Sequence, residues 1–148
     1  MRVLLQRVSQ AEVTVEGEKI AAIGPGLLLF LGVADGDSPA DADWLVEKVA
    51  NLRVFYDQND KMNLSLLDIA GEALVVSQFT LYGDCRKGRR PGFDQAGAPA
   101  LANELYEYFK QKLAGKNIPV SAGRFGAHME VSLVNDGPVT FIIDSPSK

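Results

Sequence analysis

Cysteine and histidine are nearly absent from this chain of 148 residues, which contains one of each. The lone cysteine, Cys85, excludes an internal disulfide and a multi-cysteine zinc site. Cys85 and His128 together are too few ligands for a zinc site, so we expect no metal. A Cys–His catalytic pair is also disfavoured, because no motif links the two residues and His128 begins a segment that is typical of a strand.

Long apolar runs and an excess of positive charge are absent too. No apolar run approaches the roughly 18 residues that a membrane span needs, and the chain begins with alternating sequence rather than a signal-peptide core. The net charge of −4 argues against a protein that coats nucleic acid along its length, although it is compatible with gripping one end of an RNA. We therefore expect a cytoplasmic protein with one domain over residues 1–148 and with no membrane or DNA partner.

Hydrophobic patterning predicts an α+β fold. Period-2 alternation, or a continuous apolar run, predicts strands at 2–9, 11–16, 19–23, 27–33, 53–56, 72–82, 118–124, 128–134 and 139–144. A helix is predicted to begin at Pro39 with Ser38 as its N-cap, and a second helix is predicted over about 99–114. This order of elements implies a single domain in which two main helices accompany a curled, mixed and mostly antiparallel sheet of barrel-like form.

Each predicted helix has an apolar stripe that indicates its buried face. In the first helix the stripe is Ala42, Leu45, Val49 and Leu52. In the second helix it is Leu101, Leu105 and Tyr108, extended to Lys112, and Gly115 is expected to end the helix at its C′ position.

The stretch Gly24-Pro25-Gly26 is the feature that comes nearest to a phosphate loop. It lacks the Gly-Lys-Ser/Thr ending and precedes a strand rather than a helix, so a structural turn is favoured. A nucleotide cofactor is therefore not supported, and we expect a protein that works without cofactors.

Polar side chains of several kinds follow the apolar run ALVV. Ser77, Gln78 and Thr80 come at the end of a predicted strand, before Gly83 and a loop, and this is where the rim of a pocket tends to form. Hydroxyl groups are also common on strand faces, so an ordinary strand end is the alternative. Thr80 would be a poor unaided nucleophile, because the sequence supplies no obvious base to activate it. The motif therefore indicates a site that binds and orients rather than one that attacks.

A dense basic cluster interrupts this acidic chain. Arg86, Lys87, Arg89 and Arg90 follow Cys85 within one short segment. The cluster is either a solvated loop without a function or a phosphate contact, since arginine forks match phosphate oxygens.

The segment 131–144 has the alternation of two strands, joined at Asn135-Asp136-Gly137-Pro138. A two-residue hairpin favours Asn-Gly or Asp-Gly, yet here a proline follows at once. Because Pro138 has no N–H to donate to a ladder, it cannot sit inside a central strand. The join is either a simple turn or a restricted piece of backbone placed where chemistry needs it.

From end to end, the chain resembles the D-aminoacyl-tRNA deacylase family, historically called D-tyrosyl-tRNA deacylase. The resemblance rests on RVLLQRVSQAEVTV, GPGLLLFLGV, NDKMNLSLLD, SQFTLYGD, FGAHMEVSLVNDGPVT and the closing FIID. The stretches at 77–82 and 135–140 match the family's two signatures. The resemblance implies a homodimer of curled mixed sheets that hydrolyses the ester between a D-amino acid and the 3′-terminal adenosine of tRNA. The implied partners are the aminoacyl-tRNA 3′ end and a second copy of the chain.

By the same resemblance, Gly137-Pro138 is the family's Gly-cisPro motif, which reaches across the dimer into the partner's pocket. Proline is the residue at which a cis bond costs least, about 0.5–1 kcal/mol, and glycine permits close approach. Two converging carbonyl oxygens would bind the α-ammonium group of the substrate, and the side chain of an L substrate would then clash with backbone. In this geometry the D side chain makes few specific contacts, so many D-amino acids are accepted. Glycine has no side chain to clash, so glycyl-tRNA is predicted as a second substrate. Arg7 is expected to brace the motif across the interface, the alternative being a surface arginine.

The resemblance also assigns roles around the strand end. Backbone N–H groups near Phe79 and Thr80 are candidates to bind the oxyanion, while the substrate's 2′-hydroxyl assists the attacking water and Thr80 supports it. Ser77, Gln78 and Met129 are expected to line the pocket. Phe125 is expected to stack on the terminal adenine, and residues 86–90 to touch phosphates near the acceptor end. Core packing is the alternative for Phe125 and Met129.

Three rival hypotheses stay open at the level of sequence. In the first, Thr80 is a covalent nucleophile. In the second, the protein is a non-catalytic dimer that binds D-amino acids or RNA ends. In the third, it is a general esterase for L-aminoacyl substrates.

Overall fold

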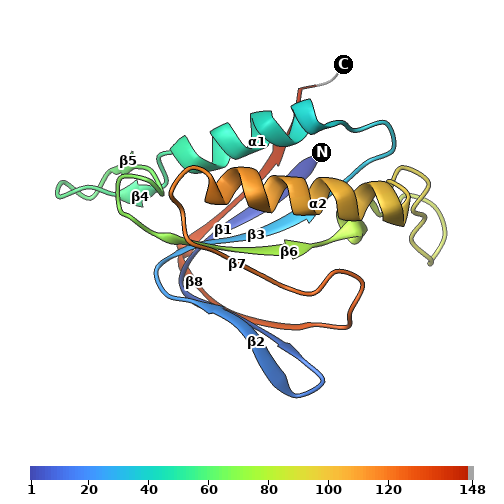
Figure 1. Ribbon diagram of the computed structural model, residues 1–148, viewed down its shortest axis with the longest axis horizontal. Coiled ribbons are helices and arrows are strands. Elements are labelled where there is room, and N and C mark those ends of the chain that lie inside the picture. Colours follow the sequence, from blue (N-terminus) through green and yellow to red (C-terminus); the bar gives the residue numbers. More distant parts are fainter. Residues whose placement is uncertain (147–148) are drawn as a thin grey trace.

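The computed structural model describes residues 1–146 as a curled sheet with two helices packed on one of its faces (Figure 1). The main sheet has the order β2-β1-β3-β6-β7, and β8 pairs with β1. Its strands are β1 Arg2–Val15, β2 Glu18–Ile23, β3 Gly26–Gly32, β6 Glu72–Ser77, β7 Val120–Ala122 and β8 Glu130–Asp144. The other elements are α1 Pro39–Asn51, α2 Pro99–Ala114, the 3₁₀ helix η1 Phe79–Tyr82, and a separate two-stranded sheet of β4 Phe55–Tyr56 and β5 Met62–Leu64.

The long strand β1 organises the sheet. It pairs antiparallel with β3 through residues 2–8, with β2 through residues 11–15, and with β8 along almost its whole length. The ladders from β3 to β6 and from β6 to β7 are parallel, so the sheet is mixed. The predicted α+β fold, with two main helices and a barrel-like mixed sheet, is confirmed.

Two apolar cores lie on the two faces of this sheet. The larger core is between the sheet and the helices, and it includes Leu5, Leu29, Leu45 and Phe109. The second core fills the inside of the curl with residues such as Val13, Leu28 and Val76 from β1, β3 and β6. The central strand β3 is almost fully buried because both of its faces are covered, which explains its continuous apolar sequence.

Local sequence signals set the ends of the helices. At the start of α1, the Asp41 carboxylate accepts hydrogen bonds from the backbone N–H and the hydroxyl of Ser38, at 2.8 and 2.9 Å. At the end of α2, Gly115 has a φ of −62°, and the left-handed residue is instead Asn117 with a φ of 62°. The predicted stop is confirmed, because the helix ends at Ala114, although Gly115 is the C-cap residue rather than C′. Neither helix within residues 1–146 is long and apolar enough to cross a membrane.

The buried face of α2 also differs from the predicted stripe. Leu105 is buried as expected, but Tyr108 is only partly buried and Lys112 is exposed. The residues that face the core are Ala102, Leu105, Tyr106, Phe109 and Leu113. The predicted stripe is thus rotated by about one residue, because the core follows the aromatic side chains of Tyr106 and Phe109.

The segment 131–144 is not a hairpin. Both halves of β8 pair with β1 in the same antiparallel direction, from Thr14↔Glu130 to Arg2↔Asp144. Between the pairs Val8↔Asn135 and Gln6↔Thr140, the chain advances two positions on β1 and five on β8. The Asn135–Pro138 stretch is therefore a large bulge in one continuous strand, which is a position where proline is tolerated.

Three other predicted strand boundaries need correction. Residues 2–9 and 11–16 form one strand, and the strand predicted at 118–124 is limited to Val120–Ala122. The strand predicted at 72–82 ends at Ser77, and its last part is η1. The ladder with the parallel neighbour β3 ends at the pair Leu31↔Ser77, and β3 itself continues by one residue to Gly32.

Candidate active site

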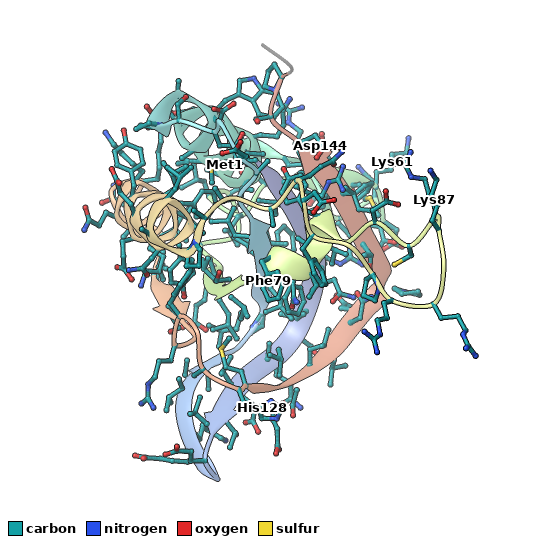
Figure 2. The ribbon with its side chains drawn as sticks, turned by 90° about the vertical axis from the view of Figure 1, so that its right-hand side faces the viewer. Met1, Lys61, Phe79, Lys87, His128 and Asp144 are labelled. Atoms are coloured by element: carbon teal, nitrogen blue, oxygen red, sulfur yellow. The ribbon has the colours of Figure 1, made fainter. Side chains whose placement is uncertain are left out.

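A cavity of about 630 Å³ opens beside the end of β6. One wall consists of the end of β6 and the residues that follow it, and the opposite wall is the loop 125–129 between β7 and β8. Phe93, residues 96–99 and the start of α2 close a third side. Figure 2 shows Phe79 on η1 at the centre of this face and His128 below it on the loop that leads into β8.

Five of the residues that the sequence singles out line this one cavity. They are Ser77, Gln78, Phe79, Phe125 and Met129. Two segments that are far apart in the sequence thus meet here, and both belong to stretches that the resemblance rests on. Their roles toward a substrate stay predictions.

The cavity is chemically neutral. Among the described residues that line it, none has an ionisable side chain. Its mouth carries an aromatic pair, because Phe79 is 54% exposed and its ring meets that of Phe93 edge to face, with centroids 5.0 Å apart. Any acid–base group that serves this site must therefore come from the substrate, from water or from residues beyond the lining.

The helix η1 presents main-chain donors. Gln78 follows the strand as the N-cap of η1, and its N–H donates to Leu31 O at 2.8 Å. The first N–H groups of a helix have no intrahelical acceptor, and within residues 1–146 the N–H groups of Phe79 and Thr80 have no hydrogen-bond partner. Phe79 also lines the cavity, so η1 places a residue with an unpaired main-chain N–H among its lining residues.

Thr80 lies one residue beyond the cavity lining. Its side chain is exposed, and its hydroxyl oxygen accepts a hydrogen bond from the side-chain amide of Gln78. An amide does not act as a base at neutral pH, so Gln78 orients this hydroxyl without activating it.

The far end of η1 is held by Arg2. Its Nη1 donates to Leu81 O at 3.0 Å, while its Nε and Nη2 donate to the Asp144 carboxylate at 2.7 and 3.2 Å. The hydrogen bond to Asp144 raises the pKa of Arg2 above its ordinary value. Partial burial, together with the nearby Asp37 carboxylate, raises the pKa of Tyr82 to about 12.

Gly32 allows η1 to lie directly against β3. A Cβ atom at Gly32 would be 3.2 Å from Leu81 Cβ and 3.3 Å from Gln78 O. A side chain here would push η1 away from the sheet, so this glycine helps to set the position of the cavity wall.

Cys85 and His128 lie outside the cavity. Cys85 is exposed and lines a separate shallow depression with Arg2 and Asp84. His128 is exposed on the loop before β8.

The bulge that contains Gly137 and Pro138 does not line the cavity of its own chain. The Gly137–Pro138 peptide bond is cis, Gly137 has a φ of 131°, and residues 136–138 are exposed. Arg7 Nε donates to Asp136 O at 3.1 Å, and Arg7 Nη1 donates to Val54 O at 2.6 Å. Arg7 therefore contacts the bulge within one chain and is buried rather than a surface residue, whereas bracing across an interface stays a prediction.

The basic cluster forms an exposed loop, closed by the backbone pair Asp84–Gly92. Arg86 is already engaged, since its Nε and Nη2 donate to the Asp84 carboxylate at 2.8 and 2.7 Å and lower the pKa of that group. Within the described part of the chain, Lys87, Arg89 and Arg90 have no ion-pair or hydrogen-bond partner. Lys87 projects at the outer end of this loop (Figure 2).

One wall of the cavity escaped sequence reasoning. Phe93 and residues 96–98 contribute to the lining, although they belong to no predicted strand or helix. The feature of the sequence that could have indicated this wall is the run of small residues Ala96-Gly97-Ala98 before Pro99. At Gly97 a Cβ would come within 3.1 Å of Ala34 O, so this run packs closely against the end of β3.

Comparison with known proteins gives a consistent result. The family model described as D-Tyr-tRNA(Tyr) deacylase matches residues 4–144. The D-aminoacyl-tRNA deacylase of Clostridioides difficile (strain 630) is 59% identical over 145 residues, which cover 98% of this chain and 97% of that protein. The D-aminoacyl-tRNA deacylase of Geotalea daltonii (strain DSM 22248 / JCM 15807 / FRC-32) is 56% identical over 148 residues, 100% of this chain and 99% of that protein.

Solved structures agree at the level of the fold. A structure named "c-Myc DNA Unwinding Element Binding Protein" superposes with a TM-score of 0.93 at 40% identity and covers 99% of this chain and 100% of that one. A second, described as "a probable eukaryotic D-amino acid tRNA deacylase", has a TM-score of 0.82 at 21% identity, covers 97% and 98% of the two chains, and shows the shared fold alone. The family match spans both signature stretches, and the chain therefore belongs to the D-Tyr-tRNA(Tyr) deacylase family.

Proposed function

We propose that this protein hydrolyses the ester bond of D-aminoacyl-tRNA and releases a free D-amino acid and tRNA. The observation that carries the proposal is the identity of 59% with a D-aminoacyl-tRNA deacylase along 98% of this chain. The cavity supports it, because residues of the first signature line it and its size suits an aminoacyl group with part of a nucleoside. We expect the enzyme to act in the cytoplasm, where its tRNA substrate is used.

The chemistry that we propose relies on the substrate for its base. Water adds to the ester carbonyl, and the N–H groups of Phe79 and Thr80 hold the oxyanion that forms. The intermediate then expels the 3′ oxygen of the terminal adenosine, and the neighbouring 2′-hydroxyl gives its proton to this oxygen while it takes one from the attacking water. A cavity lined without ionisable side chains supports this route over one that uses a protein base.

Thr80 has a supporting role in this mechanism. Its hydroxyl accepts from the Gln78 amide, and nothing in the cavity lining can remove its proton. The rival in which Thr80 attacks the ester would need a base at this point.

We further propose that the enzyme is a homodimer in which the Gly137–Pro138 bulge of each subunit enters the cavity of the other. Among the described strands β8 pairs with β1 alone, so its other edge is open and offers a template on which a second chain can pair. This edge carries large exposed apolar side chains, including Phe141 at 41% and Ile142 at 63% exposure.

In the assembled site the bulge would select handedness. Main-chain carbonyl oxygens of the bulge would bind the α-ammonium group while the N–H groups of η1 hold the carbonyl oxygen. With both groups fixed, an L substrate must direct its side chain into backbone and is rejected by clash. A D side chain would point outward and be read loosely, and glycine has no side chain to clash, so several D-aminoacyl-tRNAs and glycyl-tRNA are the expected substrates.

Mixed dimers test whether the bulge acts between subunits. Phe79→Pro removes one N–H donor at a helix start, where proline is tolerated, and loss of one oxyanion donor lowers kcat by about 10²–10³. Gly137→Val distorts the bulge, because a Cβ at Gly137 would lie 2.7 Å from Val139 Cγ2. If the bulge works in the partner's cavity, a mixed dimer contains one site with neither defect and activity returns. If mixed dimers are seen by native mass spectrometry and remain inactive, the bulge does not act across the interface.

Recognition of the RNA is proposed to be limited to its 3′ end. Phe125 would stack on the terminal adenine, a contact worth about 1–3 kcal/mol, and Lys87, Arg89 and Arg90 would touch nearby phosphates. Few such contacts fit the net charge of −4 and predict a shallow dependence on salt. We expect no role for DNA, so a duplex competitor should leave the deacylation rate unchanged.

The decisive experiment for the activity uses D-tyrosyl-tRNA in molar excess over protein. An enzyme releases tyrosine over many turnovers, whereas a non-catalytic binding module protects the ester from spontaneous hydrolysis. Release that stops at one equivalent, or protection of the ester, would contradict the proposal.

A further inference from the structure

The loop that forms one cavity wall has little secondary structure to hold it. The ladder between β6 and β7 ends at the pair Val75↔Ala122, and β8 begins at Glu130. Among the described residues, the hydrogen bonds that tie residues 123–128 to the rest of the chain are made at Gly123. The positions of Phe125 and Met129 therefore depend on how Gly123 is fixed.

Gly123 is fixed from two sides. Its N–H donates to Val75 O at 3.0 Å, and its carbonyl oxygen accepts from the hydroxyl of Tyr106 at 3.2 Å. The same hydroxyl lies 3.1 Å from Val75 O, so it bridges β6 and the loop. Val75 O retains the Gly123 N–H if the hydroxyl is removed, whereas within residues 1–146 Gly123 O has no other partner.

The two cavity residues of the loop pack directly on this anchor. The rings of Tyr106 and Phe125 have centroids 5.9 Å apart at an angle of 43°. A Cβ built on Gly123 would lie 2.6 Å from Met129 Sδ, so the Met129 side chain rests against the glycine. A shift of Gly123 would therefore move both Phe125 and Met129.

We propose that Tyr106, which is 1% exposed on the core face of α2, is a positioning residue for the substrate site. Its hydroxyl fixes Gly123 and thereby places Phe125 and Met129 for the nucleoside end of the substrate. The link to catalysis rests on the proposed function, while the placement of the loop does not. Tyr106 itself does not line the cavity, so it acts through the loop.

The chain supplies a matched control on the same helix. Tyr108 has a hydroxyl that donates to the Asp43 carboxylate, at 3.0 and 3.2 Å from its two oxygens, and joins α2 to α1 away from the cavity. Tyr106→Phe and Tyr108→Phe delete the same atom from neighbouring positions of one helix. Only the first deletion removes the partner of Gly123 O.

The first readout needs no substrate. Hydrogen exchange at the two amides of this loop that donate hydrogen bonds, Gly123 and Ala127, should become about three- to ten-fold faster in Tyr106→Phe, which is the scale of one lost hydrogen bond, and should stay as in wild type in Tyr108→Phe. Equal exchange in the two variants would overturn the proposal. If wild type shows no turnover at all, the proposed function fails, yet this readout still decides the role of Tyr106.

The second readout separates positioning from general weakening of the fold. For D-tyrosyl-tRNA, Tyr106→Phe should raise KM about three- to ten-fold with kcat within about two-fold of wild type, because binding rather than the reacting atoms is affected. A fall in kcat at unchanged KM would overturn the proposal. If Tyr106→Phe does not fold, Gly123→Ala is the second variant, because it displaces Met129 while Tyr106 stays intact. An unchanged KM in Gly123→Ala would also overturn the proposal.

Discussion

Replacing Arg7 with alanine tests how the Gly137–Pro138 bulge is held in place. The Arg7 side chain is 2% exposed, and it donates to Val54 O at 2.6 Å and to Asp136 O at 3.1 Å. Its guanidinium also lies over the ring of Tyr56, 4.4 Å from the centroid. One side chain of β1 thus connects the segment before β4 with the bulge in β8.

The magnitude follows from these interactions. A buried carbonyl that loses its donor costs about 1–3 kcal/mol, and removal of the cation–π interaction adds about 0.5–1 kcal/mol. Part of this cost is offset, because Arg7 Nη2 is buried without an acceptor within residues 1–146. The net expectation for Arg7→Ala is a decrease of about 1–3 kcal/mol in the free energy of unfolding.

Asp136→Asn is the matched control. The Asp136 side chain is 59% exposed and lies 3.3 Å from Arg7 Nε, so removing its charge should cost less than about 1 kcal/mol. The main-chain carbonyl of residue 136 remains in this variant. Urea unfolding of both variants gives the free energies, and deacylation rates show whether the bulge still functions. An Arg7→Ala protein with wild-type stability and rate, or an Asp136→Asn protein that loses as much as Arg7→Ala, would refute the reasoning.

Three further predictions concern the site and the ends of η1. Thr80→Ala should lower kcat by less than about ten-fold, since Thr80 is proposed only to support the attacking water, and a fall of roughly 10⁴-fold or more would favour the hypothesis that Thr80 is the nucleophile. Replacing Lys87 and Arg89 by glutamine should raise KM for aminoacyl-tRNA. It should also reduce the slope of log affinity against log salt concentration by about one for each phosphate that is no longer neutralised. An unchanged slope would exclude this loop from RNA binding. Because the pKa of Tyr82 is raised from 10.0 to about 12, its contribution to stability is complete below pH 10 and is lost as the pH rises to 12. Tyr82→Phe should therefore lose less stability than wild type between pH 9 and 11 in urea unfolding, and superimposable profiles would contradict this.

Much of the fold can be read from the sequence because local signals agree with the tertiary structure. Pro99 and the apolar spacing after it predict the helix 99–114 with the bounds that the structure has. The strand prediction fails at Phe79–Tyr82 because aromatic and β-branched residues favour a strand there. The ladder with β3 ends at the pair Leu31↔Ser77, and the chain turns into η1 beside Gly32, where the missing Cβ leaves room for it. The alternation of apolar residues in one segment cannot show where its ladder with another strand ends.

The bulge in β8 illustrates a second limit. Alternation on each side of Asn135–Pro138 is the same whether the halves form a hairpin or one strand. Pairing of both halves with β1 decides the matter, and this pairing is distant in the sequence.

For the candidate site, the motif at 77–79 and the residues Phe125 and Met129 could be named in advance, because their sequence stretches are specific. The wall formed by Phe93 and residues 96–99 could not, since small residues before a helix carry no signal for a pocket.

The central claim is that this protein hydrolyses aminoacyl-tRNA with selection for the D configuration. The most direct measurement is the ratio of kcat/KM for D-tyrosyl-tRNA to that for L-tyrosyl-tRNA, on the same tRNA and at the same ionic strength. Rejection of the L substrate by clash predicts a ratio well above roughly 200, the upper end of what the fit of one methylene in a pocket provides. A ratio near one would identify a general esterase, and any ratio below roughly 200 would contradict selection by exclusion of the L side chain.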